Sequence, residues 1–347
     1  MRKVLKISIF LFFSAIVLSV ALFFGIKYFS DRKEENKENE QTFDRTPLDA
    51  DSVFGDYIFE KIVRETLSLP EGEIDFDVLA EITELDLSFE GASLDENNKI
   101  QSLSGLKHFT GLKKLIVDNN MFSSLSGIEA CSGLEYLSAQ GCRIYSATEL
   151  ENLTELRFLK LKNNEITDTS FLSNLTNLEY LNLSGCPISD LEFLAETSLP
   201  NLKELYIAST GFTEMEWIYL LSGLEKLDVS GNELNDELLV GLELLTNLKY
   251  FKASSQNIKT MKVFTDCKNL KTLILDINQI TDLSGLEELQ NLEELNVNSN
   301  LIRKIDTLAK MPNLKRVYAK NNEITSFSPI SNIIYEEEDF SENPGKR

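Results

Sequence analysis

Apolar positions recur with a fixed period along most of the chain. From residue 82 onward the pattern is L-x-x-L-x-L-x-x-N-x-I, and successive copies are 22 residues apart except for one insertion of eight residues and two of two residues. The first apolar position falls at Ile82, Leu112, Leu134, Leu156, Leu178, Leu202, Leu224, Leu248, Leu270, Leu292 and Leu314. The pattern predicts eleven stacked repeats over residues 82–330, in place of the two globular domains that 347 residues would otherwise indicate.

The L-x-L step in each repeat predicts a short strand, because alternate side chains of a strand point to the same face. Equivalent strands about 4.8 Å apart would build a parallel sheet roughly 50 Å long over a leucine core. An asparagine follows most strands and is expected to bond the backbone of the turn: Asn120, Asn164, Asn232, Asn278, Asn300 and Asn322. The same column holds Cys142, Cys186, Thr210 and Gln256, and each is expected to face inward.

These repeats resemble the leucine-rich repeat family, with LKKLIVDNNMF, LRFLKLKNNEI and LEKLDVSGNEL as clear instances of its motif. The resemblance implies an α/β solenoid, a horseshoe whose parallel sheet lines the concave face. The stretch FGDYIFEKIVRETLSLPEGEIDFDVLAEITELDLS resembles the amino-terminal cap of bacterial internalins. The resemblance covers residues 51 to about 330.

Both ends of the array are expected to be capped. Residues 51–81 carry an amphipathic helix from Asp56 to Ser68, closed by Pro70 and Gly72, which can cover the open end of the core. Residues 331–347 are acidic and are expected to form a carboxyl-terminal cap or tail.

The amino end predicts a membrane anchor. Residues 7–26 read ISIFLFFSAIVLSVALFFGI, long enough for a helix to cross a bilayer. Arg2, Lys3 and Lys6 precede it, so we expect the amino terminus in the cytoplasm and the repeats outside. A signal peptide cleaved near Ala21 is the alternative, although the apolar run continues beyond that site. Residues 1–29 are thus the anchor or an uncleaved signal, and residues 30–50 form a disordered charged linker.

Charge and composition argue against several classes of function. The chain has 34 Lys and Arg against 56 Asp and Glu, a net charge of −22, which argues against a nucleic-acid partner. His108 is the single histidine, and no phosphate loop, nucleophile elbow or paired catalytic carboxylate is apparent. We therefore expect no enzyme, no small-molecule substrate and no cofactor.

The repeat register predicts that all four cysteines are free. Cys142 and Cys186 are two repeats apart, about 10 Å, which exceeds the roughly 7 Å limit between the Cα atoms of a disulfide. Cys131 and Cys267 are six repeats apart and cannot pair. Small core residues are the expected role, rather than metal ligands.

Two further motifs are weak. The acidic insertion at residues 90–98 offers Asp95 and Glu96 to calcium but lacks the ligand order of a calcium loop, which favours a solvated loop. The N-glycosylation acceptors at Asn152, Asn174 and Asn182 arise from the rhythm of the repeat itself.

The outward strand positions predict where a partner binds. Aromatic side chains gather there in neighbouring repeats and form the candidate binding surface: Tyr136, Phe158, Tyr180, Tyr206 and Tyr250. Exposed aromatic rings are enriched in interfaces, but neighbouring rings on a sheet also stabilise each other without a ligand.

The sequence thus predicts a membrane-anchored extracytoplasmic protein that binds another protein or a cell-surface polymer through its concave face. One alternative is a structural scaffold of the cell envelope. A regulator of a phosphatase-like partner, which the 22-residue repeat class implies for cytosolic members, is a further alternative, and the export signal counts against it.

Overall fold

The computed structural model describes residues 52–69, 72, 74–90, 98–188, 194 and 199–347. The chain divides into two compact units, Met1–Pro47 and Leu48–Arg347, and the first lies wholly outside the described residues. The membrane segment predicted over residues 7–26 and the linker over residues 30–50 therefore also lie outside them. Among the residues that the structure does describe, no helix combines the length and apolarity that crossing a membrane requires.

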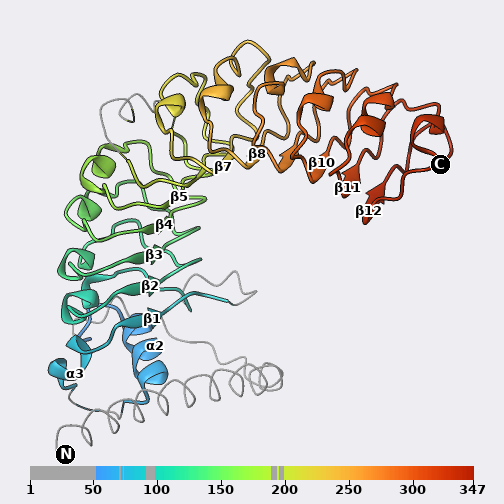
Figure 1. Ribbon diagram of the computed structural model, residues 1–347. Coiled ribbons are helices and arrows are strands. Elements are labelled where there is room, and N and C mark those ends of the chain that lie inside the picture. Colours follow the sequence, from blue (N-terminus) through green and yellow to red (C-terminus); the bar gives the residue numbers. More distant parts are fainter. Residues whose placement is uncertain (1–51, 70–71, 73, 91–97, 189–193, 195–198) are drawn as a thin grey trace, which may run out of the picture. The chain divides into compact units, whose positions relative to one another are not determined.

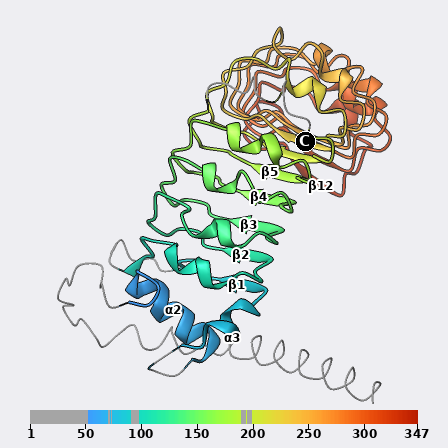
Figure 2. The ribbon, with the colours of Figure 1, turned by 90° about the vertical axis from the view of Figure 1, so that its left-hand side faces the viewer.

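The second unit is built on one parallel sheet of 12 strands, hydrogen-bonded in sequence order over its described residues. The strands lie along the inner side of a curved row of coils (Figure 1), and β1 to β5 stack as parallel rungs in Figure 2. Their bounds are β1 Glu84–Asp86, β2 Lys114–Ile116, β3 Tyr136–Ser138, β4 Phe158–Lys160, β5 Tyr180–Asn182, β6 Glu204–Tyr206, β7 Lys226–Asp228, β8 Tyr250–Lys252, β9 Thr272–Ile274, β10 Glu294–Asn296, β11 Arg316–Tyr318 and β12 Glu337–Asp339.

Short 3-10 helices form the outer side of the coils (Figure 1). A tight helix suits this side because a 22-residue coil has few residues in which to turn back toward the next strand. Their bounds are η2 Ser104–His108, η3 Ile128–Ala130, η4 Thr148–Leu150, η5 Ser170–Asn174, η6 Ile218–Leu220, η7 Leu242–Leu244, η8 Lys262–Phe264, η9 Leu286–Glu288, η10 Asp306–Lys310 and η11 Ser328–Ile330.

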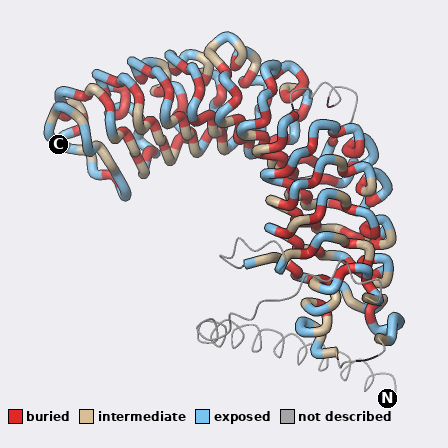
Figure 3. Tube along the Cα trace, turned by 180° about the vertical axis from the view of Figure 1, so that it is seen from behind, coloured by how far each residue is buried: buried red, intermediate tan, exposed pale blue. Residues whose placement is uncertain are grey.

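The core lies between the sheet and these helices. The middle residue of each strand from β1 to β11 is apolar and buried, as are the other repeat leucines, so buried positions recur in every coil (Figure 3). The parallel solenoid predicted from the L-x-L steps is confirmed. The acidic segment assigned to a carboxyl-terminal cap or tail contains a strand as well, because β12 pairs with β11 in parallel register.

An amphipathic helix covers the first coil, as predicted for residues 56–68. Helix α2, Tyr57–Leu67, buries Phe59 and Val63, and the short helix α3, Phe76–Ala80, follows. Asp56 caps α2 by accepting the backbone N–H of Phe59 at 2.9 Å. Its other carboxylate oxygen accepts the N–H groups of Gln101 at 2.7 Å and Ser102 at 2.9 Å. One buried carboxylate therefore caps the helix and ties it to the first repeat.

The asparagine column forms a ladder of buried hydrogen bonds between coils. Asn164 is typical: its Nδ2 donates to the carbonyls of Leu161 at 2.7 Å and Ala139 at 2.8 Å. Its Oδ1 accepts the backbone N–H groups of Cys142 at 3.1 Å and Ile144 at 3.0 Å in the preceding coil. Each such amide thus satisfies backbone groups of two coils that have no water to bond.

The exceptions in this column face inward as predicted. Cys142 and Cys186 are fully buried, and their thiols donate to the carbonyls of Val117 and Leu161, both at 3.2 Å. Thr210 and Gln256 are also buried, and each side chain donates to a backbone carbonyl. A second, exposed column was not predicted. Its amides donate to a carbonyl of the preceding coil, and its members are Asn177, Asn201, Asn247, Asn269, Asn291 and Asn313.

The residue before each ladder position has a left-handed backbone. Glycine or asparagine occupies it in several coils, and φ is 58° at Asn163 and 67° at Gly231. Ile277 has φ of 57° at the same position, although a β-branched residue is disfavoured there. Its side chain is 56% exposed, so little packing offsets this strain.

Replacing Asn164 by Ala should destabilise the repeat unit by about 3 kcal/mol or more, because two backbone N–H groups and the Ala139 carbonyl would lose their partner inside the core and the Leu161 carbonyl would keep only the Cys186 thiol. Asn177→Ala is the matched control: its single bond to the carbonyl of Thr154 is exposed, and about 1 kcal/mol or less is expected. Urea unfolding followed by circular dichroism measures both. Equal shifts of the midpoint would show that the ladder is not the dominant stabilising contact.

Replacing Ile277 by Asn should stabilise the unit by about 1 kcal/mol, since asparagine tolerates the left-handed conformation. The melting temperature should rise, whereas Ile277→Val, which keeps the β-branch, should leave it unchanged. A lower melting temperature for the asparagine variant would contradict the assignment of strain.

Candidate functional site

The three-residue strands decide which side chains reach the concave surface. In β2 to β6 the central leucine is buried, as is Phe251 at the centre of β8, and the residues before and after it point away from the core. This arrangement places all five predicted binding residues on the outward face of the sheet. Tyr136, Phe158, Tyr180 and Tyr250 begin their strands, and Tyr206 ends β6.

Four of these aromatic side chains are in contact. The register pairs Tyr136 with Phe158 and Phe158 with Tyr180, and the ring centroids are 6.0 and 6.4 Å apart. Tyr206 continues the line from the neighbouring outward position, 5.1 Å from Tyr180. The rings are tilted by 31° to 33° to one another, and all four residues are half-buried. We call Tyr136, Phe158, Tyr180 and Tyr206 the aromatic row.

Tyr250 stands apart from the aromatic row. Glu204 and Lys226 occupy its column on β6 and β7, where they form an ion pair of 2.9 Å. Burial, together with the negative charges of Asp228, Glu294 and Asp276, raises the pKa of Tyr250 to about 12. The structure therefore places Tyr250 on the same surface but in a separate, acidic environment.

The far end of the aromatic row is fixed by a hydrogen bond. The Tyr206 hydroxyl donates to Oε2 of Glu204 at 2.9 Å. Burial and this contact raise the pKa of Tyr206 above its usual value, so the hydroxyl stays protonated. The hydroxyl donor at this end of the row is therefore already engaged.

Cations border the rest of the row, a feature that the sequence analysis missed. Lys160 places its Nζ 5.2 Å from the ring centroid of Tyr136 and 5.4 Å from that of Tyr180. Lys114 lies 5.9 Å from the Tyr136 ring, and the Arg157 guanidinium lies 5.8 Å from the Phe158 ring. The available signal was spacing: Lys160 ends the strand that Phe158 begins, so both point outward.

A shallow hollow of about 320 Å³ adjoins the row. Its lining is Thr83, Glu84, Lys113, Lys114, Glu135, Tyr136, Arg157 and Phe158. Lys114 pairs with Glu84 and Lys113 with Glu135, each at 3.2 Å. The row thus presents ring surface beside a neutralised polar hollow, a combination suited to a polypeptide with apolar and polar groups.

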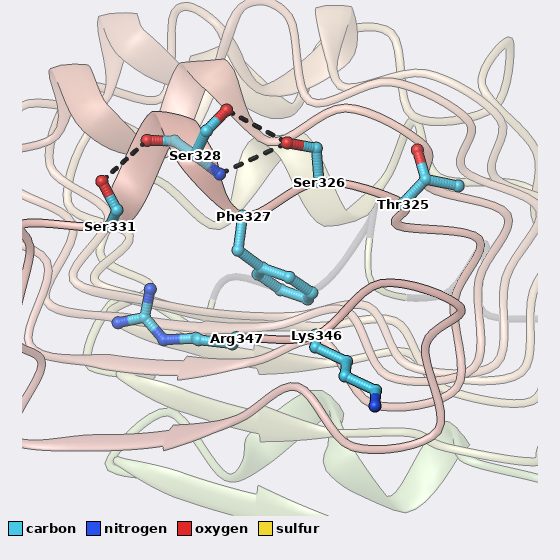
Figure 4. A pocket seen from close by; sticks show the side chains of 7 residues that line it. All are labelled: Thr325, Ser326, Phe327, Ser328, Ser331, Lys346 and Arg347. Carbon is cyan, nitrogen blue, oxygen red and sulfur yellow. Dashed lines mark hydrogen bonds between the residues drawn. The ribbon is translucent and has the colours of Figure 1, made fainter.

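A second hollow, of about 540 Å³, lies at the last coil (Figure 4), and several of its lining residues bond to neighbouring parts of the chain. The Ser328 backbone N–H donates to Oγ of Ser326, and the Ser331 hydroxyl donates to the Ser328 carbonyl. Arg347 donates to the carbonyls of Ile330 and Ile333 and to Glu338, which closes the end of the chain over the core.

The remaining chemistry-bearing residues are buried or stacked. Burial raises the pKa of the Cys131, Cys142 and Cys267 thiols to about 12, and that of Cys186 to about 11. All four are free thiols. His108 stacks on Phe76 at 3.9 Å in the amino-terminal cap, and burial followed by the charge of Lys107 lowers its pKa.

Metal binding has no support in the described part of the chain, where no three His, Cys, Asp or Glu side chains are grouped to hold an ion. The acidic insertion with Asp95 and Glu96 lies outside the described residues. The aromatic row is the candidate site, because it gathers four contacting rings on the outward face of the sheet.

Comparisons with known proteins agree with this fold. The family described as Leucine Rich repeats (2 copies) matches residues 154–196 and 290–332, and that described as Leucine Rich repeat matches residues 224–237. No curated protein matches the sequence.

Solved structures give broader coverage. An internalin of Listeria monocytogenes, InlF, is 22% identical, with 88% of this chain and 95% of that one covered and a TM-score of 0.68. InlJ of the same organism, whose functional domain includes a cysteine ladder, is 20% identical over 85% of this chain and 61% of its own, with a TM-score of 0.66.

The plant peptide hormone receptor RGFR1, solved in complex with RGF2, is 18% identical over 78% of this chain and 50% of its own, with a TM-score of 0.57. At identities this low, the structural similarity establishes the fold alone. The chain thus contains leucine-rich repeats and has a solenoid fold similar to that of the internalins, as the resemblance read from its sequence predicts.

Proposed function

We propose that this chain is a binding protein whose concave face holds a protein partner at the aromatic row. The observation that carries the proposal is the row itself, four half-buried rings in contact on the outward face of the sheet. Aromatic side chains provide large contact areas at a low cost in conformational entropy, and they dominate binding energies in interfaces.

The fold supports this role. Leucine-rich repeats offer a continuous concave surface to proteins and peptides, and RGFR1, which shares the fold, was solved with RGF2 bound. In this chain the leucines and the asparagine ladder are committed to the core, which leaves the outward strand positions to recognise a partner. Catalysis is not part of the proposal, because the row offers ring faces and ion-paired charges rather than a nucleophile and a base.

The proposal includes the location of the binding surface. Residues 7–26 would anchor the chain in a membrane, and Arg2, Lys3 and Lys6 would hold the amino terminus in the cytoplasm. The repeats would then be presented outside the cell membrane, where they meet a partner protein. The support for this part is the sequence pattern alone.

The double substitution Phe158→Ser and Tyr180→Ser should weaken binding by about tenfold or more, because it removes the two central rings. The measurement uses the full chain and peptides that it selects from a library of random dodecapeptides, titrated by fluorescence anisotropy. Tyr250→Ser is the matched control, an aromatic residue of the same surface outside the row, and its affinity should stay within about twofold. Unchanged affinity for the double variant would refute the site.

Protease added outside intact cells, after removal of any wall, should digest the repeat domain of the full chain. A tag at residue 1 should survive, because the proposed topology keeps the amino terminus in the cytoplasm. Replacing Arg2, Lys3 and Lys6 with Glu should lower the fraction of correctly oriented chains. A repeat domain that resists protease until the cells are lysed would contradict the topology.

A further inference from the structure

Lys160 differs from the other cations of the sheet. Lys114, Lys226, Lys252 and Arg316 also point outward from their strands, and each forms an ion pair with a carboxylate on the preceding strand, at 3.2, 2.9, 3.5 and 2.8 Å. The register places Ser138 opposite Lys160 on the preceding strand and Asn182 on the following one. Neither neighbour is a carboxylate, and within the described residues Lys160 forms no ion pair, although the charge of Asp118 is near enough to raise its pKa.

Two rings take the place of that carboxylate. The Lys160 ammonium lies between Tyr136 and Tyr180, at 5.2 and 5.4 Å from their ring centroids. A lysine over an aromatic face is attracted by the negative face of the ring, and it remains a full positive charge. Partial burial alone would lower the pKa of Lys160, but the contact with the Tyr136 hydroxyl and the electrostatic effects of Tyr136, Tyr180 and Asp118 outweigh it, so the pKa lies above its usual value.

The placement of this charge restricts what the aromatic row can accept. Aromatic cages often bind cationic ligands, but here the protein's own ammonium already occupies the space between the rings. A second cation would be repelled. A carboxylate, in contrast, would complete the ion pair that the other outward cations of the sheet already have, while apolar groups beside it would pack on Phe158 and the tyrosine rings.

The neighbouring charges favour a single acidic group over a polyanion. Arg157 and Lys203 both pair with Glu179, and Lys113 pairs with Glu135. A phosphate-rich polymer would need several unpaired cations in line, whereas this part of the sheet neutralises most of its own. A protein segment with one acidic residue among apolar ones fits better.

We propose that Lys160 is a specificity-determining residue that receives an Asp or Glu side chain of the partner, from a segment in which apolar residues flank the acid. This inference rests on the proposed binding function of the aromatic row. It adds the chemical class of the partner and assigns one residue to its recognition.

The test begins with the full chain and a library of random dodecapeptides displayed on phage. The native chain should enrich peptides in which Asp or Glu adjoins an apolar residue. Lys160→Met, which keeps the apolar stem and removes the charge, should still select apolar peptides but without acidic enrichment. Lys252→Met is the matched control: Lys252 occupies the equivalent outward position on β8 and pairs with Asp228, and its variant should keep the acidic preference.

A double-mutant cycle makes the test quantitative. A peptide selected by the native chain, with its acid replaced by the corresponding amide, should bind the native chain about five- to tenfold more weakly. The same replacement should change the affinity for Lys160→Met by less than about twofold. An equal loss on both proteins, or no acidic enrichment by the native chain, would overturn the assignment of Lys160.

Failure of this inference can be told apart from failure of the proposed function. If no peptides are selected, or if the double substitution of Phe158 and Tyr180 leaves selection intact, the aromatic row is not the binding site. If selection needs the rings but the acid and its amide bind equally, only the role of Lys160 is refuted. Binding of inorganic polyphosphate that depends on Lys160, without acidic enrichment of peptides, would assign the site to a polyanionic polymer and overturn the inference.

Discussion

The structure depends on satisfying backbone groups where each coil leaves its strand. Residues there turn through a left-handed conformation into the core, where water does not reach their N–H and C=O groups. The buried asparagines solve this by bonding two coils at once, as Asn164 does with carbonyls of its own coil and the one before. No coil can make these bonds alone, so the backbone groups of a coil are satisfied only when a neighbouring coil stacks on it. Burial of the repeat leucines then follows from the stacking.

That constraint separates the residues that hold the fold from those free to bind. Every coil must supply inward apolar residues and a turn amide or its substitute, and Cys142 and Gln256 show how different side chains can fill the latter role. The outward strand residues are needed neither for core packing nor for these backbone hydrogen bonds. Each strand pairs with the next in a fixed register, so outward side chains of neighbouring strands lie at a fixed spacing. Four aromatic residues in successive coils therefore form one continuous row. The side chains of the row are therefore held at fixed positions by the sheet, which would lower the entropy cost of binding a partner.

Periodicity explains which features could be predicted from the sequence. The strands β1 to β11 and the helix α2 follow from apolar spacing and capping residues, so their residues could be named individually. Strand β12 was missed as a strand because its coil departs from the motif: Tyr335, Glu338 and Phe340 replace the three leucines, although Asn343 still bonds as a ladder residue. The column of exposed amides was missed because a surface asparagine has no burial signal.

The candidate site could be predicted only in part. Position in the repeat was enough to place Tyr136, Phe158, Tyr180 and Tyr206 on one face. Predicting which charges pair requires knowing the residue opposite each charge on the neighbouring strand. The strand register gives that residue, and the composition of the chain does not. Among the described residues Lys160 forms no ion pair, because Ser138 stands where the other outward cations of the sheet meet an acid.

The net charge of the whole chain bears on how Lys160 would attract an acidic partner. A net charge of −22 disfavours the approach of an acidic partner, although physiological salt largely screens this repulsion beyond roughly 8 Å. Attraction to Lys160 acts only once the partner has reached the sheet, because its charge is set among acids such as Asp118. Recognition at the aromatic row would therefore be short-range, and selectivity would appear in the rate of dissociation more than in the rate of encounter. A single cation between two rings suits that task, since it discriminates among bound segments without drawing every acidic protein to the surface.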